Sequence, residues 1–193
     1  TKSLHSFTVQ CLGDIIFNVE SFEDSNVGQI VLESNGLISF GKKSFQECTN
    51  LSSVVIRCAS NVTFGIEAFE ESEIHELNVT WSNETNTSFL LEESSVIEFK
   101  KNSFKECNSL TTVDVNTKGN VDIGENSFQN SKALKNLNVH ADGSAVVGQN
   151  AFSGCSNLQS PNIDSPNKNV SDCIFGNCQN GSGGNNGKKN HKL

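Results

Sequence analysis

The sequence contains no methionine and no tyrosine, a single tryptophan and only two prolines among its 193 residues. No apolar stretch approaches the roughly 18 residues that a membrane-spanning helix needs, and the first residues lack the charged and apolar segments of a signal peptide. Basic residues are also scarce, with 14 Lys and Arg against 22 Asp and Glu and a net charge of −8. This balance argues against nucleic acid as a partner, and we expect membrane contact only through sequence that flanks this chain.

Phenylalanine is abundant by contrast, with 13 copies, and its positions reveal an internal repeat. One column of phenylalanines, called the spine below, recurs at spacings of 23, 24, 35, 24, 24 and 23 residues: Phe22, Phe45, Phe69, Phe104, Phe128, Phe152 and Phe175. A serine or alanine precedes each of the first six, and three residues after each stands a serine or cysteine. A unit of about 24 residues is too small to bury its own apolar face, so neighbouring units must stack and share a core.

Each repeat also ends with two apolar residues that are separated by one residue. The pairs are Ile30 and Leu32, Val54 and Ile56, Leu77 and Val79, Val113 and Val115, Leu137 and Val139, and Pro161 and Ile163. Alternation of this kind predicts a strand with one buried face, and stacked repeats join such strands into a parallel sheet. We therefore predict a mainly β solenoid of about seven turns over residues 1–178, with the sheet on its concave face and short turns or 3-10 segments on its convex side. Residues 179–193, rich in Gly, Asn and Lys, are expected to form a flexible tail.

The repeat also resembles that of a known family. The segment from Val121 to Val139, VDIGENSFQNSKALKNLNV, is similar to the repeat of BspA-like (Treponema pallidum-type) leucine-rich-repeat proteins, whose pattern is roughly I-G-x-x-A-F-x-x-C-x-x-L-x-x-I-x-I. The resemblance covers residues 4 to 178. It implies a leucine-rich-repeat solenoid that adheres to host proteins, matrix or other cells. Two departures, the missing proline after the strand and Lys100 at the turn glycine, leave the subgroup open.

The first residues align with the middle of a repeat, because Phe7, Val9 and Cys11 correspond to Val54, Ile56 and Cys58. Solenoids need polar caps at their ends, and none is visible here. We therefore expect the chain to be an excerpt of a longer array.

The seven cysteines have three interpretations, namely packing, disulfides or a metal site. Cys48, Cys107 and Cys155 occupy one column on alternate turns, about 10 Å apart at ~4.8 Å per strand, which is too far for a disulfide. Packing as buried thiols is the favoured interpretation for these three. Cys11 and Cys58 are likewise two turns apart. One terminal disulfide remains open among Cys155, Cys173 and Cys178, of which Cys155 and Cys178 lie on adjacent turns. No ligand spacing typical of zinc occurs, and we expect no metal and no cofactor.

Candidate binding residues lie at the outward positions of the predicted strands. From the middle of the chain onward these positions carry amides, carboxylates and one imidazole. The candidates are Glu33, Arg57, Asn78, Thr80, Asp114, Asn116, Asn138, His140, Asn162 and Asp164. Two interpretations stay open: the columns contact a ligand, or they hydrogen-bond one another and serve solubility.

The 35-residue spacing between Phe69 and Phe104 indicates an insertion of about 11 residues, placed at roughly 80–95. It carries Trp81, Phe89, Leu90 and Leu91, which form either a contact patch or a small satellite core.

These features favour a non-catalytic binding module over an enzyme, because no histidine stands where the repeat would pair it with a nucleophile. The leading hypothesis is a cell-surface or extracellular adhesin-like protein that binds a protein or glycan ligand, such as a host surface or matrix. The alternative is an intracellular, cytoplasmic scaffold, which buried reduced thiols would also suit. Seven N-x-Ser/Thr sequons, at Asn50, Asn61, Asn78, Asn83, Asn86, Asn169 and Asn180, are compatible with a glycoprotein but barely exceed chance.

Overall fold

The computed structural model describes residues 5–82 and 95–176, and these form a β-solenoid built from two parallel sheets. The odd-strand sheet comprises β1 (Phe7–Cys11), β3 (Gln29–Ser34), β5 (Ser53–Cys58), β7 (Glu76–Trp81), β9 (Thr112–Thr117), β11 (Asn136–Ala141) and β13 (Asn162–Asp164). The even-strand sheet comprises β2 (Ile15–Phe17), β4 (Ile38–Phe40), β6 (Val62–Phe64), β8 (Val96–Phe99), β10 (Asn120–Ile123), β12 (Ser144–Val147) and β14 (Asn167–Val170). The described part of the chain contains no helix.

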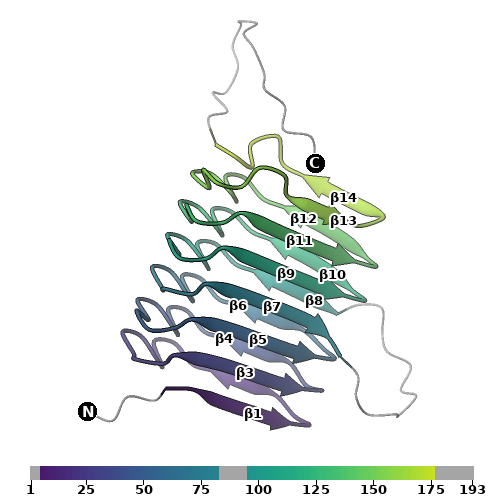
Figure 1. The fold of residues 1–193 in the computed structure, drawn as a ribbon. Coiled ribbons are helices and arrows are strands. Elements are labelled where there is room, and N and C mark those ends of the chain that lie inside the picture. The colour runs from purple at the N-terminus through teal and green to yellow at the C-terminus, as the bar shows by residue number, and fades with distance from the viewer. Residues whose placement is uncertain (1–4, 83–94, 177–193) are drawn as a thin grey trace, which may run out of the picture.

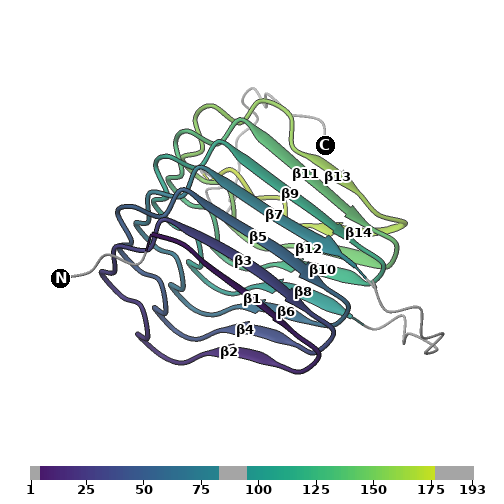
Figure 2. The ribbon, with the colours of Figure 1, turned by 60° about the horizontal axis from the view of Figure 1, so that its bottom comes forward.

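Each coil of the solenoid is a wedge. In every coil except the one with the insertion between β7 and β8, an odd strand leads through a short connection into the following even strand, and the two sheets approach each other on that side (Figures 1 and 2). On the opposite side they are joined by the turns that carry the spine phenylalanines. The predicted mainly β solenoid is confirmed. The structure adds a second sheet to it, because short segments upstream of the spine pair from coil to coil as strands of three or four residues.

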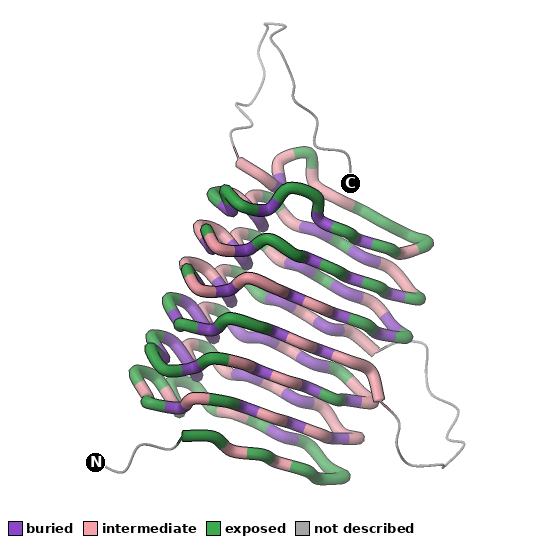
Figure 3. Tube along the Cα trace, viewed as in Figure 1, coloured by how far each residue is buried: buried purple, intermediate pink, exposed green. Residues whose placement is uncertain are grey.

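The register between strands follows the columns read from the sequence. Ile30 pairs with Val54, and Leu32 pairs with Ile56, so the apolar partners of successive repeats lie side by side. These inward residues are buried from β3 to β13 and partly buried in β1, whereas the residues between them are more exposed (Figure 3). The alternation buries one face of each strand and leaves the other to solvent.

Phenylalanine rings fill the space between the sheets and the turns. In the spine, the ring centroids of Phe45 and Phe69 are 5.2 Å apart and those of Phe69 and Phe104 are 4.9 Å apart, with nearly parallel planes. A second column from the even strands packs edge-on against it, as where Phe40 meets Phe69 at 5.0 Å. Aromatic pairs of this kind contribute about 0.5–1.5 kcal/mol each beyond their buried area. The insertion before Phe104 therefore leaves the core continuous.

The serine and cysteine column after the spine has a hydrogen-bonding role. Ser72 Oγ donates to the carbonyl of Phe45 at 2.7 Å, and Ser131 Oγ donates to that of Phe104 at 2.8 Å. Cys107 Sγ makes the equivalent contact with the carbonyl of Phe69 at 3.0 Å. Both residue types are small and can donate a hydrogen bond, so either satisfies a buried carbonyl without disturbing the stack. Cys48 and Cys155 repeat this contact, and the predicted packing role of the three cysteines is confirmed.

The turns need two left-handed residues per coil, placed two positions before and two positions after the spine phenylalanine. In the first coils these are acidic residues and lysine, and in the later coils mostly asparagine and glycine. The set is Glu20, Asp24, Lys43, Glu47, Glu67, Glu71, Asn102, Glu106, Asn126, Asn130, Asn150 and Gly154. Asparagine and glycine tolerate this backbone conformation best, so the later turns are the less strained ones.

Candidate binding surface

The outward residues of the later odd strands form a groove. In register, Asn78, Asp114, Asn138 and Asn162 make one row across β7, β9, β11 and β13. Thr80, Asn116, His140 and Asp164 make the next row. Together with backbone between the rows they line a shallow depression of about 300 Å³, called the polar groove below. The structure thus brings together eight of the candidate residues named from the sequence.

Hydrogen bonds link side chains of the polar groove, both along one row and between the two rows. Asn138 Nδ2 donates to Asp114 Oδ1 at 2.7 Å. Thr80 Oγ1 donates to Asn78 Oδ1 at 2.8 Å within β7. Some of the polar groups therefore satisfy one another, as the solubility interpretation expects, but most of these side chains remain half-buried or exposed.

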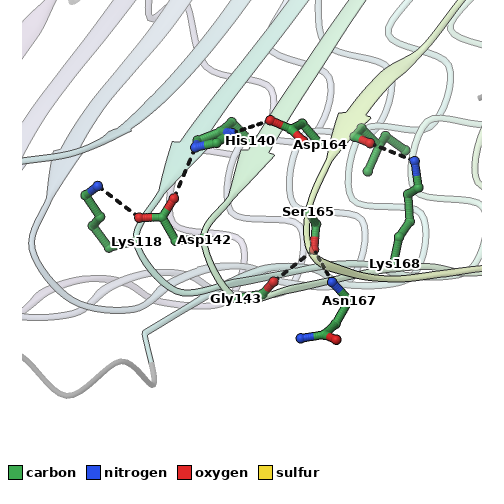
Figure 4. A network of polar contacts seen from close by, with 9 residues as sticks. Lys118, His140, Asp142, Gly143, Asp164, Ser165, Asn167 and Lys168 are labelled. Atoms are coloured by element: carbon green, nitrogen blue, oxygen red, sulfur yellow. Dashed lines mark hydrogen bonds and ion pairs between the residues drawn. The ribbon is translucent and has the colours of Figure 1, made fainter.

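His140 lies between two carboxylates at one end of the groove. Its Nδ1 is 2.9 Å from Asp164 Oδ2, and its Nε2 is 3.1 Å from Asp142 Oδ1 (Figure 4). Asp142 also accepts a hydrogen bond from Lys118, whose Nζ is 2.9 Å away. The bond from Lys118, supported by that from His140, holds the pKa of Asp142 below its usual value. Sequence reasoning missed Lys118 and Asp142 because both follow the ends of strands, outside the repeating columns.

The first odd strands present a different surface. Arg57 Nη1 lies 2.6 Å from Glu33 Oε1, so the two charged candidates of this region neutralise each other. Gln10 donates to the same carboxylate from β1. These residues border a second depression of about 380 Å³, which is also lined by Cys11, Leu12, Ser34, Asn35 and Ser82. Of these residues, the sequence columns had pointed only to Glu33 and Arg57 as candidates.

The insertion begins later than predicted. Thr80 pairs with Arg57 and Trp81 pairs with Cys58, so both belong to β7 and not to a loop. The sequence places the insertion at roughly 80–95, and the structure shows that β7 includes the first two of these residues. Phe89, Leu90 and Leu91 lie outside the described residues.

The six cysteines of residues 5–82 and 95–176 comprise five free thiols and one disulfide-bonded residue. Cys48, Cys58, Cys107 and Cys155 are buried free thiols, whereas Cys11 is free and exposed. Burial raises the pKa of Cys155 to about 12 and that of Cys107 further still, so both remain protonated at neutral pH. Cys173 is disulfide-bonded. A bridge through Cys155, one of the pairings left open, is therefore wrong, since its thiol bonds to the carbonyl of Phe128 instead.

Within residues 5–82 and 95–176, no three His, Cys, Asp or Glu side chains come together as a group that could hold a metal ion. In that part of the chain, no helix has the length and apolar character to cross a membrane.

The stacked parallel coils, the aromatic spine and the outward polar columns define a leucine-rich-repeat solenoid. The family model of the BspA type leucine-rich repeat region matches residues 15–90 and 82–182 in six copies, and the chain belongs to this family. No curated protein and no solved structure matches it significantly. Repeats of this type form protein-binding modules.

Proposed function

We propose that this chain is the binding module of a cell-surface or secreted adhesin-like protein, without catalytic activity, and that the polar groove contacts its ligand. The groove carries the proposal, because outward side chains from four consecutive coils converge there on one depression. Extended sheet faces of this kind are the surfaces that solenoids use for binding. The ligand class is a protein or a glycan on a host surface or matrix.

Attachment of the purified chain to matrix-coated plates and to cultured cells tests this proposal. The variant Asn138→Ala/His140→Ala removes two groove side chains, and we expect it to weaken attachment about tenfold, since two lost polar contacts typically total more than 1 kcal/mol. Asn169→Ala/Asp122→Ala is the matched control, because both residues are exposed on the even-strand sheet. Equal attachment of the two variants would exclude the groove as the contact surface.

The insertion supplies a second candidate surface, through Trp81, Phe89, Leu90 and Leu91. Trp81 is half-buried at the end of β7 and so leads directly into this segment. A variant in which residues 83–94 are replaced by a short Gly/Ser linker separates the two surfaces. If only this variant loses attachment, the insertion and not the groove contacts the ligand.

The disulfide-bonded Cys173 favours a surface or extracellular location over the cytoplasmic alternative, since disulfides persist in oxidising compartments. Three sequon asparagines of the described residues, Asn50, Asn61 and Asn169, are exposed, as glycosylation requires. Mass spectrometry of protein from its native source, without reduction, checks both features. A free Cys173 thiol together with unmodified Asn50, Asn61 and Asn169 would support the intracellular scaffold instead.

A further inference from the structure

The charges that face the polar groove are unbalanced. Asp114 and Asp164 project from β9 and β13, and the described residues that line the groove include neither lysine nor arginine. The cations on neighbouring segments have other partners: Arg57 on β5 pairs with Glu33, Lys118 pairs with Asp142, and Lys168 Nζ donates to the carbonyl of Ile163 at 3.0 Å. A ligand with positive charge therefore meets carboxylates that no other cation neutralises.

Each of the two carboxylates retains an oxygen for a ligand. Asp114 uses Oδ1 to accept from Asn138, and Asp164 uses Oδ2 in its contact with His140. Among the described residues, the other oxygen of each has no hydrogen-bond partner. The Asp164 side chain is 70% exposed, so this oxygen is open to a ligand. Carboxylates in this state accept charge-assisted hydrogen bonds from guanidinium or ammonium groups.

The positions of Asp114 and Asp164 determine how far apart two basic residues of a ligand must lie to contact both. Asp164 is two strands and two residues away from Asp114 in the register of the sheet. With ~4.8 Å between strands and ~3.4 Å per residue, their Cα atoms are separated by about 12 Å along a diagonal. In an extended peptide, side chains at positions i and i+4 lie on one side and about 13 Å apart. Two basic residues at that separation match the two carboxylates.

The amides between the carboxylates suit a polypeptide backbone. Asn116, Asn138 and Asn162 are exposed and offer both carbonyl oxygens and NH₂ groups. No phenylalanine, tyrosine or tryptophan lines the described groove, and its one imidazole, His140, is held between Asp142 and Asp164, so polar contacts dominate the surface offered to a ligand.

We infer that the polar groove binds an extended polypeptide segment with two basic residues, at positions i and i+4. One of them contacts Asp114 and the other contacts Asp164. Asn116, Asn138 and Asn162 bind the backbone of the segment. This inference rests on the proposed function. The acidic net charge of the chain adds attraction at long range, and screening by salt weakens it.

The test measures binding of a fluorescein-labelled peptide, Gly-Ser-Arg-Ser-Gly-Ser-Arg-Ser-Gly, to the full 193-residue chain by fluorescence anisotropy. Its control peptide carries glutamine in place of both arginines. We expect the basic peptide alone to bind, with affinity falling as the salt concentration rises from 50 to 500 mM. Asp114→Asn and Asp164→Asn should each weaken binding about threefold or more, and the double variant by the product of the two.

Asp122→Asn is the matched control, because it removes the same charge from the opposite sheet. Unchanged binding in Asp122→Asn supports the inference. Equal weakening in all three single variants would show an effect of net charge only and would overturn it, as would equal binding of the glutamine peptide.

Selection from a random displayed 12-residue peptide library separates the inference from the proposed function. Both are supported if the selection enriches peptides with basic residues at positions i and i+4 and if Asn138→Ala/His140→Ala abolishes this enrichment. Enriched neutral or acidic peptides that still require Asn138 and His140 would overturn the basic-ligand inference and leave the proposed function standing. If no enriched peptide depends on the groove, the inference is overturned, and the attachment assay with Asn138→Ala/His140→Ala decides the proposed function separately.

Discussion

The first and the last coils of the odd-strand sheet share their inward residues and differ in their outward ones. On β3 and β5 the outward row begins with Val31 and Val55, both half-buried, whereas the same row on β9 and β11 holds Asp114 and Asn138. Inward, all four strands bury Val, Ile or Leu. The repeat frame is thus maintained by the inward columns, and the outward columns are available for change without loss of the fold.

The turns show a second difference between the same regions. Glu47 and Glu71 adopt left-handed backbone in the earlier coils, where Asn130 and Gly154 occupy the equivalent positions in the later ones. A left-handed conformation costs an L-residue such as glutamate about 1–2 kcal/mol, and asparagine and glycine less. The earlier coils therefore store strain that the later coils avoid.

The largest expected effect comes from the shared spine. Phe104→Ala removes a fully buried ring that contacts Phe64, Phe69 and Phe128, and should lower the free energy of unfolding by about 3–5 kcal/mol. Phe22 lies in the first coil and is only half-buried, so Phe22→Ala should cost clearly less. Urea unfolding followed by circular dichroism measures both. If both variants lose the same free energy of unfolding, the core is not better packed in the middle coils than in the first coil.

The hydroxyl and thiol column should give the next largest effect. Ser131→Ala leaves the buried carbonyl of Phe104 without its side-chain donor, and we expect a loss of about 1–3 kcal/mol. Ser131→Cys keeps a donor of similar size, as the neighbouring Cys107 does, and should cost less than about 1 kcal/mol. If the two variants are equally stable, packing alone explains the column and the hydrogen bond is dispensable.

A smaller effect, of opposite sign, follows from the strained turns. Glu47→Asn should raise the free energy of unfolding by about 0.5–1 kcal/mol, because asparagine tolerates the left-handed backbone. Glu47→Gln is the control, since it removes the charge near Asp24 and Glu71 but keeps an unbranched side chain with the same backbone cost. An equal gain from both variants would assign the effect to charge repulsion and not to backbone strain.

The stacking order was predictable because the signal repeats. The spine phenylalanines recur at nearly constant spacing, and a pattern that returns seven times outweighs any single local propensity. The outward rows could then be aligned by counting from the buried pairs, which is why Asn138 and His140 were expected beside Asp114 and Asp164.

Features outside the columns could not be predicted in the same way. The even strands are short: a single repeat shows only two apolar residues around a third, such as Ile38 and Phe40, and pairing from coil to coil makes this segment a strand. Lys118 and Asp142 meet through their side chains beyond the strand ends, where no register fixes their positions. The end of β7 at Trp81 likewise becomes visible only through its pairing with Cys58 of β5.

The smallest effect on stability should come from the polar groove itself. Asn138 and His140 are exposed, so Asn138→Ala/His140→Ala should change the free energy of unfolding by less than about 0.5 kcal/mol per residue while it weakens ligand binding. Val139 lies between them and is buried, and Val139→Ala should cost on the order of 2 kcal/mol through lost methyl groups and the cavity they leave. Thermal unfolding of both variants, measured beside peptide binding, separates the two roles of one strand. A groove variant as unstable as Val139→Ala would mean that the outward row supports the fold, and its loss of binding would then say nothing about ligand contact.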